Sequence, residues 1–164
     1  MESVLFAVAS PITVADLADV LSIDVRTAER ELETLAEACR IRGVRVQRDN
    51  GFVQMVTAPE AAPYVQRVIG SDDYQPLSRA ALETLAVIAY KQPITRPDIE
   101  ALRGSGSEQA IASLKARGLI TEVGRATGRG RPVLLGTTLE FLQYFGLERP
   151  EDLSLPVSAT GAGE

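Results

Sequence analysis

Apolar residues recur every three or four positions through residues 4–39, a spacing that predicts amphipathic helices. Pro11 interrupts the pattern, and Thr13 is placed as the N-cap of a second helix with Asp16 at its third position. A third helix then extends to Cys39. The three apolar stripes are Leu5, Val8 and Ile12, then Val14, Leu17, Ala18 and Leu21, then Ala28, Leu32, Leu35, Ala36 and Cys39.

The pattern after Cys39 changes to that of strands. The run GVRVQRDNGFVQMV at residues 43–56 holds two β-rich segments joined by Asp49-Asn50-Gly51, a typical hairpin signal. Residues 58–69 return to a helical pattern. Three helices followed by a hairpin are the elements of a winged helix-turn-helix domain.

The chain then repeats this plan at an offset of 82 residues. SPITVADL at residues 10–17 aligns with QPITRPDI at 92–99, and the register holds as far as Leu32 and Leu114. The first helix of the second copy has an apolar stripe of Leu82, Leu85, Ala86 and Ala89. Thr95 and Asp98 begin its second helix, and Gly118 ends its third, at residues 107–117. The strands LITEV and PVLLG follow, and then a last helix with Thr138, Phe141, Leu142 and Phe145.

These patterns predict a mainly helical α+β fold with small β-hairpins, built from two tandem winged helix-turn-helix domains. We place the domains at residues 1–70 and 78–150, a linker at 71–77 and a flexible tail at 151–164. With 45% hydrophobic residues, the chain of 164 residues can form such cores.

Composition removes most catalytic chemistry from consideration. The chain has no histidine, and its single cysteine, Cys39, falls on a predicted buried helix face. The glycines match no phosphate-binding fingerprint, and the carboxylates are scattered over predicted helix surfaces. We therefore expect no catalytic residue, metal or cofactor. The apolar run VLFAVA is too short to cross a membrane or to act as a signal peptide, so we expect a cytoplasmic protein.

The second hairpin tip is basic, although the net charge of the chain is −5. Arg125, Arg129 and Arg131 lie there among glycines, either as a weak nucleic-acid contact or as the solvated turn of a hairpin, and we favour the turn. Winged helices usually bind DNA through the third helix, which leaves a transcription regulator as the alternative function. Both third helices argue against it, because neither presents a basic face. The first carries several carboxylates, Asp24, Glu29, Glu31, Glu33 and Glu37, and the second begins Ser107-Glu108-Gln109, where a carboxylate meets phosphates badly.

Three segments carry a resemblance to a known family: ESVLFAVASPITVADLADVL at residues 2–21, ALETLAVIAYKQPIT at 81–95 and GRPVLLGTTLEFLQYFGL at 130–147. In these the sequence resembles segregation and condensation protein B. The resemblance implies a non-enzymatic subunit of the bacterial SMC (structural maintenance of chromosomes) complex that serves chromosome condensation and partition in the nucleoid. It also implies a homodimer joined through its first domain, and a kleisin partner, segregation and condensation protein A, held by the second domain. DNA would be contacted only indirectly or weakly.

Candidate contact residues follow from the matched segments. Aromatic side chains are favoured at interfaces, so Tyr90 and Tyr144 are our first candidates for the kleisin, together with Lys91 and with Phe145, for which core packing is the preferred interpretation. For the dimer, Leu5 and Phe6 lie on opposite sides of the first helix, so one of the two is expected to face a second subunit.

Overall fold

The chain forms two sets of elements, which we call the first half (residues 1–69) and the second half (residues 76–153). Their order is the same as far as the second strand of each hairpin. The computed structural model describes residues 1–8, 10–69, 76–104, 106–128 and 130–153. The first half contains α1 (Glu2–Ala7), β1 (Ile12–Thr13), α2 (Val14–Leu21), α3 (Val25–Cys39), β2 (Val44–Asp49), β3 (Phe52–Thr57), the 3-10 helix η1 (Pro59–Ala61) and α4 (Ala62–Ile69). The second contains α5 (Arg79–Lys91), β4 (Ile94–Thr95), α6 (Arg96–Arg103), α7 (Glu108–Ala116), β5 (Ile120–Arg125), β6 (Val133–Thr137), α8 (Leu139–Phe145) and the 3-10 helix η2 (Pro150–Asp152).

Each half holds a small antiparallel sheet. The strand orders are β1-β3-β2 and β4-β6-β5, so β2 and β5 are outer strands. This confirms the mainly helical α+β class with small hairpins. The sequence pattern missed β1 and β4, where Ile12 pairs with Val53 and Ile94 with Leu135. We had placed Ile12 on the opening helix, but α1 ends at Ala7 and Ile12 is a strand residue.

Local signals in the sequence act as expected at the element ends. Thr13 accepts a hydrogen bond from the Asp16 amide at 3.0 Å, and Thr95 accepts one from the Asp98 amide at 3.4 Å. At the first hairpin, Asn50 and Gly51 both have positive φ, at 48° and 78°, as a two-residue turn of this kind requires. The two copies therefore share capping chemistry as well as element order.

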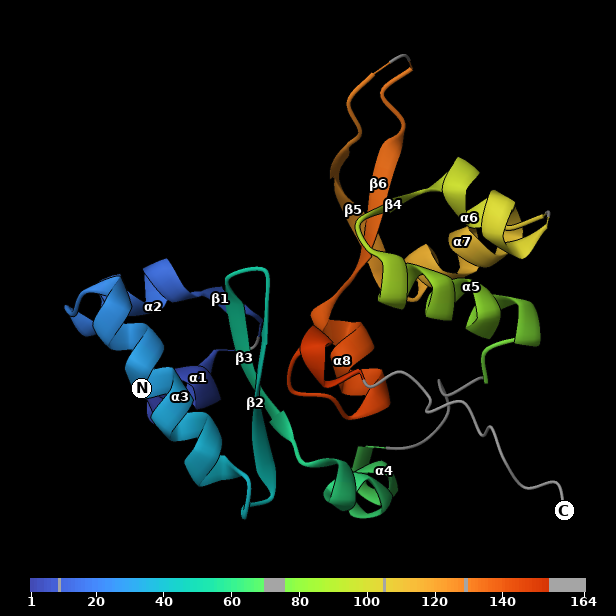
Figure 1. Cartoon of the computed structure of the whole chain (residues 1–164). Coiled ribbons are helices and arrows are strands. Elements are labelled where there is room, and N and C mark those ends of the chain that lie inside the picture. Colours follow the sequence, from blue (N-terminus) through green and yellow to red (C-terminus); the bar gives the residue numbers. More distant parts are fainter. Residues whose placement is uncertain (9, 70–75, 105, 129, 154–164) are drawn as a thin grey trace, which may run out of the picture.

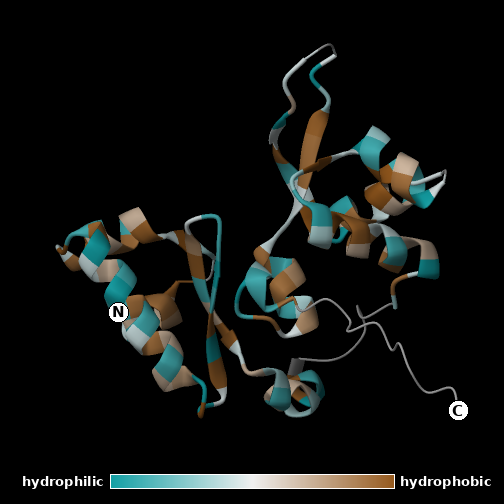
Figure 2. Cartoon of the chain, viewed as in Figure 1, coloured by the Kyte–Doolittle hydropathy of each residue, from teal (hydrophilic) through white to brown (hydrophobic). Residues whose placement is uncertain are grey.

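The two halves have separate hydrophobic cores. The first contains Leu5, Leu17, Leu32 and Cys39, and the second contains Leu85, Ile88, Leu114 and Leu142. Cys39 is buried, as predicted, and burial raises the pKa of its thiol. In Figure 2 the helices carry hydrophobic residues on one side and hydrophilic residues on the other.

Helix α5 buries a different stripe from the one we predicted. Its buried residues are Ala81, Thr84, Leu85 and Ile88, whereas Leu82 and Ala86 are exposed. Apolar residues surround most of this helix, so hydrophobic spacing alone did not single out the inner face. The result leaves apolar side chains on the surface.

Some residues of the predicted linker and of the predicted tail belong to the second half. Leu77, the last residue of the predicted linker, is buried in the second core. In the predicted flexible tail, Glu151 and Asp152 belong to η2 and Leu153 packs against the second core. The other residues of these two segments, 71–75 and 154–164, lie outside the described part of the chain, and the domain boundaries stay a prediction.

Helix α8 lies between the remainder of the second half and the first sheet, while the hairpin β5–β6 projects away from both (Figure 1). The packing of α8 and of the residues after it against β2 brings the two halves together.

Candidate protein-interaction surfaces

The motif residues that carry the resemblance at 81–95 and 130–147 meet inside the second half. The side-chain oxygen of Gln92 accepts hydrogen bonds from the backbone N–H of Thr137 at 2.6 Å and from its hydroxyl at 3.0 Å. The Thr138 hydroxyl donates to the carbonyl of Gly118 at 2.6 Å and accepts from the amide of Phe141, which begins α8. This cluster ties α5, β6 and α8 together, so it has a structural role.

An exposed apolar stripe runs along α5. Leu82, Ala86 and Tyr90 follow one another at intervals of four residues, which places them on one side of the helix. Leu82 and Tyr90 are among the exposed large hydrophobic residues of the chain, and Lys91 is exposed beside them. We call Leu82, Ala86 and Tyr90 the α5 stripe. Tyr90 of this stripe and the neighbouring Lys91 are candidates from the sequence. Leu82 and Ala86 are not, because the predicted apolar stripe assigns them to the buried face of the helix.

The aromatic residues of α8 are divided between core and surface differently from our prediction. Phe141 is buried, Tyr144 is partly buried against the second core, and Phe145 is 43% exposed. The ring of Phe145 lies 5.0 Å from that of Phe141 and 5.1 Å from that of Tyr144. The interpretation of Phe145 as a core residue is wrong, and Phe145 is the more open of the two candidates on this helix.

On α1 the structure separates the two dimer candidates. Leu5 is 2% exposed and packs in the first core, so the guess that it faces a partner is wrong. Phe6 is 82% exposed. One turn before Phe6, Glu2 pairs with Arg42 at 3.1 Å, and next to Arg42 the side chain of Ile41 is 94% exposed. Phe6 thus follows one partner of this ion pair by one helical turn, and Ile41 precedes the other partner in the chain. The sequence pattern did not reveal Ile41, because it lies in a polar, arginine-rich turn.

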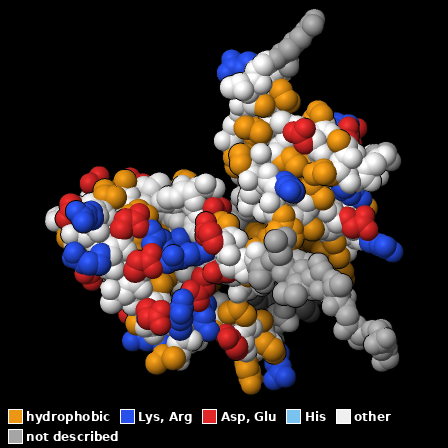
Figure 3. Space-filling model, viewed as in Figure 1, with side chains coloured by type: hydrophobic (Ala, Val, Ile, Leu, Met, Phe, Trp, Pro, Cys, Tyr) orange, Lys and Arg blue, Asp and Glu red, His pale blue; other side chains and the backbone are white. Residues whose placement is uncertain are grey.

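Neither third helix presents a basic face. On α3, Glu29 and Glu33 pair with Arg48 of β2, with 2.9 Å between Arg48 and Glu33. On α7, Glu108 pairs with Arg96 of α6 at 3.2 Å. On the face seen in Figure 3, acidic and basic side chains interleave over the first half, whereas hydrophobic side chains gather over the second half. The electrostatics of these helices do not suit the reading of DNA.

The tip of the hairpin β5–β6 carries exposed arginines. Arg125 and Arg131 are exposed, and the Arg125 guanidinium donates to the carbonyl of Arg131 at 3.4 Å across the hairpin. Gly128 and Gly130 have φ values of 106° and 83°, which favour glycine. Arg129 lies outside the described residues. These features are those of a solvated turn.

A groove separates the halves on one side of α8. Its cavity of about 590 Å³ is lined from the first half by Val56, Pro59 and Val65, and from the second by Leu119 and Phe145 among others. Arg45 and Arg117 also line it. A smaller cavity of about 540 Å³ lies between Phe52 of the first hairpin and Val123 of β5. Both cavities are bounded by both halves.

Among the described residues we find candidate contact surfaces and no cluster of side chains arranged for catalysis. Within them no group of three or more Cys, Asp or Glu side chains is placed to hold a metal ion. No helix in the described ranges has the length and apolar character needed to cross a membrane. What the arrangement presents is exposed apolar side chains on α1, α5 and α8, and such groups serve contacts with other polypeptides.

Comparison with known proteins gives one family. Residues 1–156 match the family model described as segregation and condensation complex subunit ScpB. Segregation and condensation protein B of Geobacillus kaustophilus is 45% identical over 156 residues, covering 93% of this chain and 72% of that protein. The crystal structure of ScpB from Mycobacterium tuberculosis is 36% identical, covers 89% of this chain and 92% of that one, and has a TM-score of 0.44. A solved dimer of an ScpB N-terminal domain with an ScpA peptide is 28% identical, covers 41% and 86%, and has a TM-score of 0.39.

Proposed function

The chain belongs to the family of segregation and condensation complex subunit ScpB, and from this premise we propose that it is a non-enzymatic homodimer that binds the kleisin ScpA. A subunit of a complex works through its contact surfaces, and the exposed apolar side chains of this chain supply candidates for two of them. We propose that it acts at the chromosome, in the nucleoid, as part of the SMC complex in condensation and segregation.

The α5 stripe carries this proposal. Leu82, Ala86 and Tyr90 form an exposed apolar row on a helix whose other side is packed in the second core. An amphipathic segment of the kleisin would cover the row, with Lys91 at its end available to an acidic side chain. Phe145 extends the apolar surface on α8, and Tyr144 supports the Phe145 ring from the core side.

Calorimetric titration of the purified chain with full-length ScpA tests the kleisin proposal. We expect Leu82→Asp to weaken binding by about 30-fold or more, because losing an interface anchor costs about 2 kcal/mol or more. Leu102→Asp is the matched control, since Leu102 is an exposed apolar residue on α6 of the same half. Equal affinities for the wild type and Leu82→Asp would remove the α5 stripe from the interface, and no binding by the wild type would reject the partner.

For the homodimer we propose the surface formed by Phe6 and Ile41. In a two-fold dimer the same patch serves both subunits, and two large exposed side chains beside one ion pair suit such a self-complementary contact. Light scattering should give a dimer for the wild type and a monomer for Phe6→Asp. Val25→Asp is the control, because Val25 is an exposed apolar residue at the opposite end of α3. A dimer that persists in both Phe6→Asp and Ile41→Asp places the interface elsewhere.

DNA contact, in this proposal, is weak and limited to the wing tip. The carboxylates of α3 repel phosphates and α7 presents no basic face, whereas Arg125 and Arg131 are exposed cations on a projecting hairpin. A transcription regulator is therefore the less favoured function. Enrichment of one duplex from a random library by the purified chain would support it over our proposal.

A further inference from the structure

The residues after α8 join the edge of the first sheet. Strand β2 is an outer strand, so the backbone groups on its free side have no partner within the sheet. The backbone N–H of Arg48 donates to the carbonyl of Glu148 at 3.0 Å, and the side-chain amide of Gln47 donates to the carbonyl of Leu147 at 2.6 Å. Gln47 is buried and in turn accepts a hydrogen bond from Gln54. The residues that follow α8 thereby make one backbone and one side-chain hydrogen bond with the outer strand of the first sheet.

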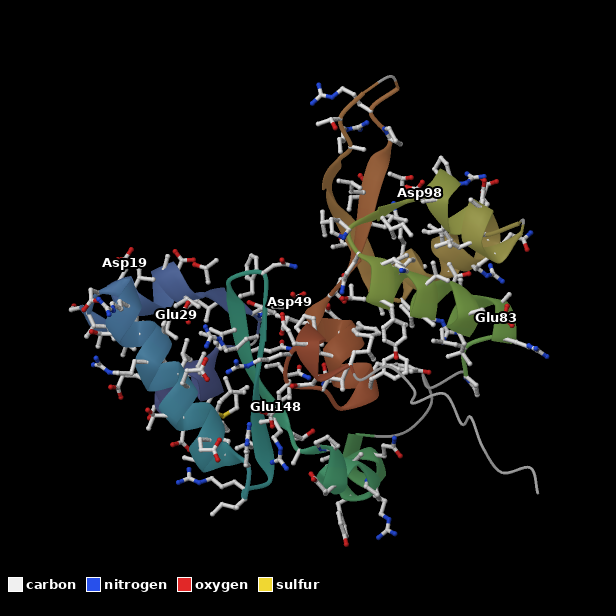
Figure 4. All side chains as sticks on the ribbon, in the orientation of Figure 1. Asp19, Glu29, Asp49, Glu83, Asp98 and Glu148 are labelled. Carbon is white, nitrogen blue, oxygen red and sulfur yellow. The ribbon has the colours of Figure 1, made fainter. Side chains whose placement is uncertain are left out.

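Alternating charges surround this segment. Glu33 of α3 lies 2.9 Å from Arg48 of its own half and 2.5 Å from Arg149 of the other. Arg45 lies 3.1 Å from Glu60 of its own half and 3.5 Å from Glu148 of the other. Figure 4 shows Glu148 beside β2 and Glu29, the second partner of Arg48, on α3. Glu33 and Arg45 of the first half therefore each pair with one opposite charge of their own half and with one of the other.

The arginines of this contact are held by their partners. The side chains of Arg45 and Arg48 are only 12% and 17% exposed. Arg149 and Glu33, which pair across the two halves, are 39% and 54% exposed, so salt screens their attraction more strongly. The hydrogen bond to Glu33 is the main cause that raises the pKa of Arg149. The pairing with Glu33 therefore favours the charged form of the Arg149 guanidinium.

The hydrophobic cores of the two halves stay separate at this contact. The two buried cores share no residue among those described, and Leu147 packs toward the core of its own half. The close apolar approach is that of Gly146 to Pro59, where a Cβ on the glycine would lie 2.8 Å from the Pro59 ring. Two units with separate cores move relative to each other unless a large hydrophobic interface joins them.

We propose that Gln47, Arg48 and Glu33 with Leu147, Glu148 and Arg149 form an electrostatic closure that sets the angle between the halves. Closed, it holds the two cavities on either side of α8 in their present shape, since both are lined by both halves. Open, it frees the outer edge of β2 and separates the walls of the groove. The state of the closure is set by ionic strength and by any ligand that competes for Glu33 or for the β2 edge.

Distance measurements between spin labels test this closure in the full chain. Cysteines introduced as Arg26→Cys on α3 and Ala112→Cys on α7 lie at exposed positions, one in each half, while Cys39 is buried away from the labelling reagent. Dilution with unlabelled protein restricts the signal to distances within one chain. We expect one short-distance population at about 0.1 M salt and a growing longer population toward about 1 M, as the Debye length falls from about 10 Å to about 3 Å.

Two substitutions assign the effect to the named charges. Arg149→Glu places a carboxylate against Glu33 and should make the longer population the major one at low salt. In a Glu33→Gln background the same substitution should have a clearly smaller effect, because the partner charge is gone. The control is Arg40→Glu, since Arg40 pairs with Glu37 on its own helix at 3.2 Å, and it should leave the distribution unchanged.

Three results would overturn the proposal: an unchanged distribution in Arg149→Glu, an equal effect of Arg149→Glu with and without Glu33, or an equal opening in Arg40→Glu. Circular dichroism of each variant separates opening from unfolding, since opening leaves the helices intact. The measurement uses the chain without ScpA, so its outcome is independent of the proposed kleisin contact.

Discussion

Leu32 and Leu114 occupy equivalent positions of the two copies, and each is fully buried in its own core. Replacing either by alanine removes the same group from a closed apolar environment. Because the cores share no residue among those described, the damage should stay within one half. Leu32→Ala should destabilise residues 1–69, and Leu114→Ala should destabilise residues 76–153.

The expected cost is about 2–5 kcal/mol for each substitution, the range for a buried leucine that leaves a cavity. For units of this size, 1 kcal/mol moves the midpoint of unfolding by about 4–8 °C, so the affected half should melt on the order of 10 °C lower or more. Hydrogen exchange followed by mass spectrometry reads both halves in one experiment, since peptides from α3 and α7 report the opening of separate cores.

The double variant supplies the decisive comparison. Its losses of protection should equal those of the single variants within about 0.5 kcal/mol, because distant sites with no shared partner add. If Leu114→Ala lowered protection in α3 as much as in α7, the halves would unfold as one unit. The division into two separately folded domains would then be wrong.

Two further outcomes follow from local contacts. Gly136→Ala should lower the free energy of unfolding by about 1–3 kcal/mol in urea titrations, because a Cβ at this position would lie 2.9 Å from the Val123 side chain. The control is Gly43→Ala, where a Cβ meets nothing within 4 Å. Equal losses of stability in the two variants would contradict the crowding argument. The hydrogen bonds from Arg79 and then Arg103 hold the pKa of Glu83 below its ordinary value of 4.5, so the stability it contributes is present above that pH and is lost as the pH falls through the lowered value. Urea titrations across that range should show a shallower acid-side decline in Glu83→Gln, and an identical decline would remove Glu83 as a cause.

The sequence predicts the fold correctly where neighbouring residues alone determine the backbone conformation. Thr13 and Thr95 as caps, and the Asn50-Gly51 turn, depend only on neighbouring residues, so the sequence alone predicted them. The sequence did not predict the short strands β1 and β4, because their two residues pair with partners about 40 residues away, such as Ile12 with Val53. A segment of two residues also shows no alternation of apolar and polar positions.

The candidate surfaces were harder to predict than the elements. On α5 an excess of apolar residues hid the inner face, so Leu82 was assigned to the core. On α8 the order of Tyr144 and Phe145 depended on the helix rotation that packing against the second core imposes. The contact between the halves was absent from the sequence-based expectations, because nothing near Arg149 marks Glu33, which lies 116 residues away, as its partner.

The bond network around Gln92 has a consequence for any search for partner-binding residues. The side chains of Gln92, Thr137 and Thr138 hold three elements of the second half in place. Substituting them should destabilise that half, so a loss of partner binding would not identify an interface residue. The segments by which such a chain is most readily assigned to its relatives are thus unsuitable starting points for mutagenesis. The informative substitutions lie on neighbouring turns of the same helices, at side chains that support no internal contact.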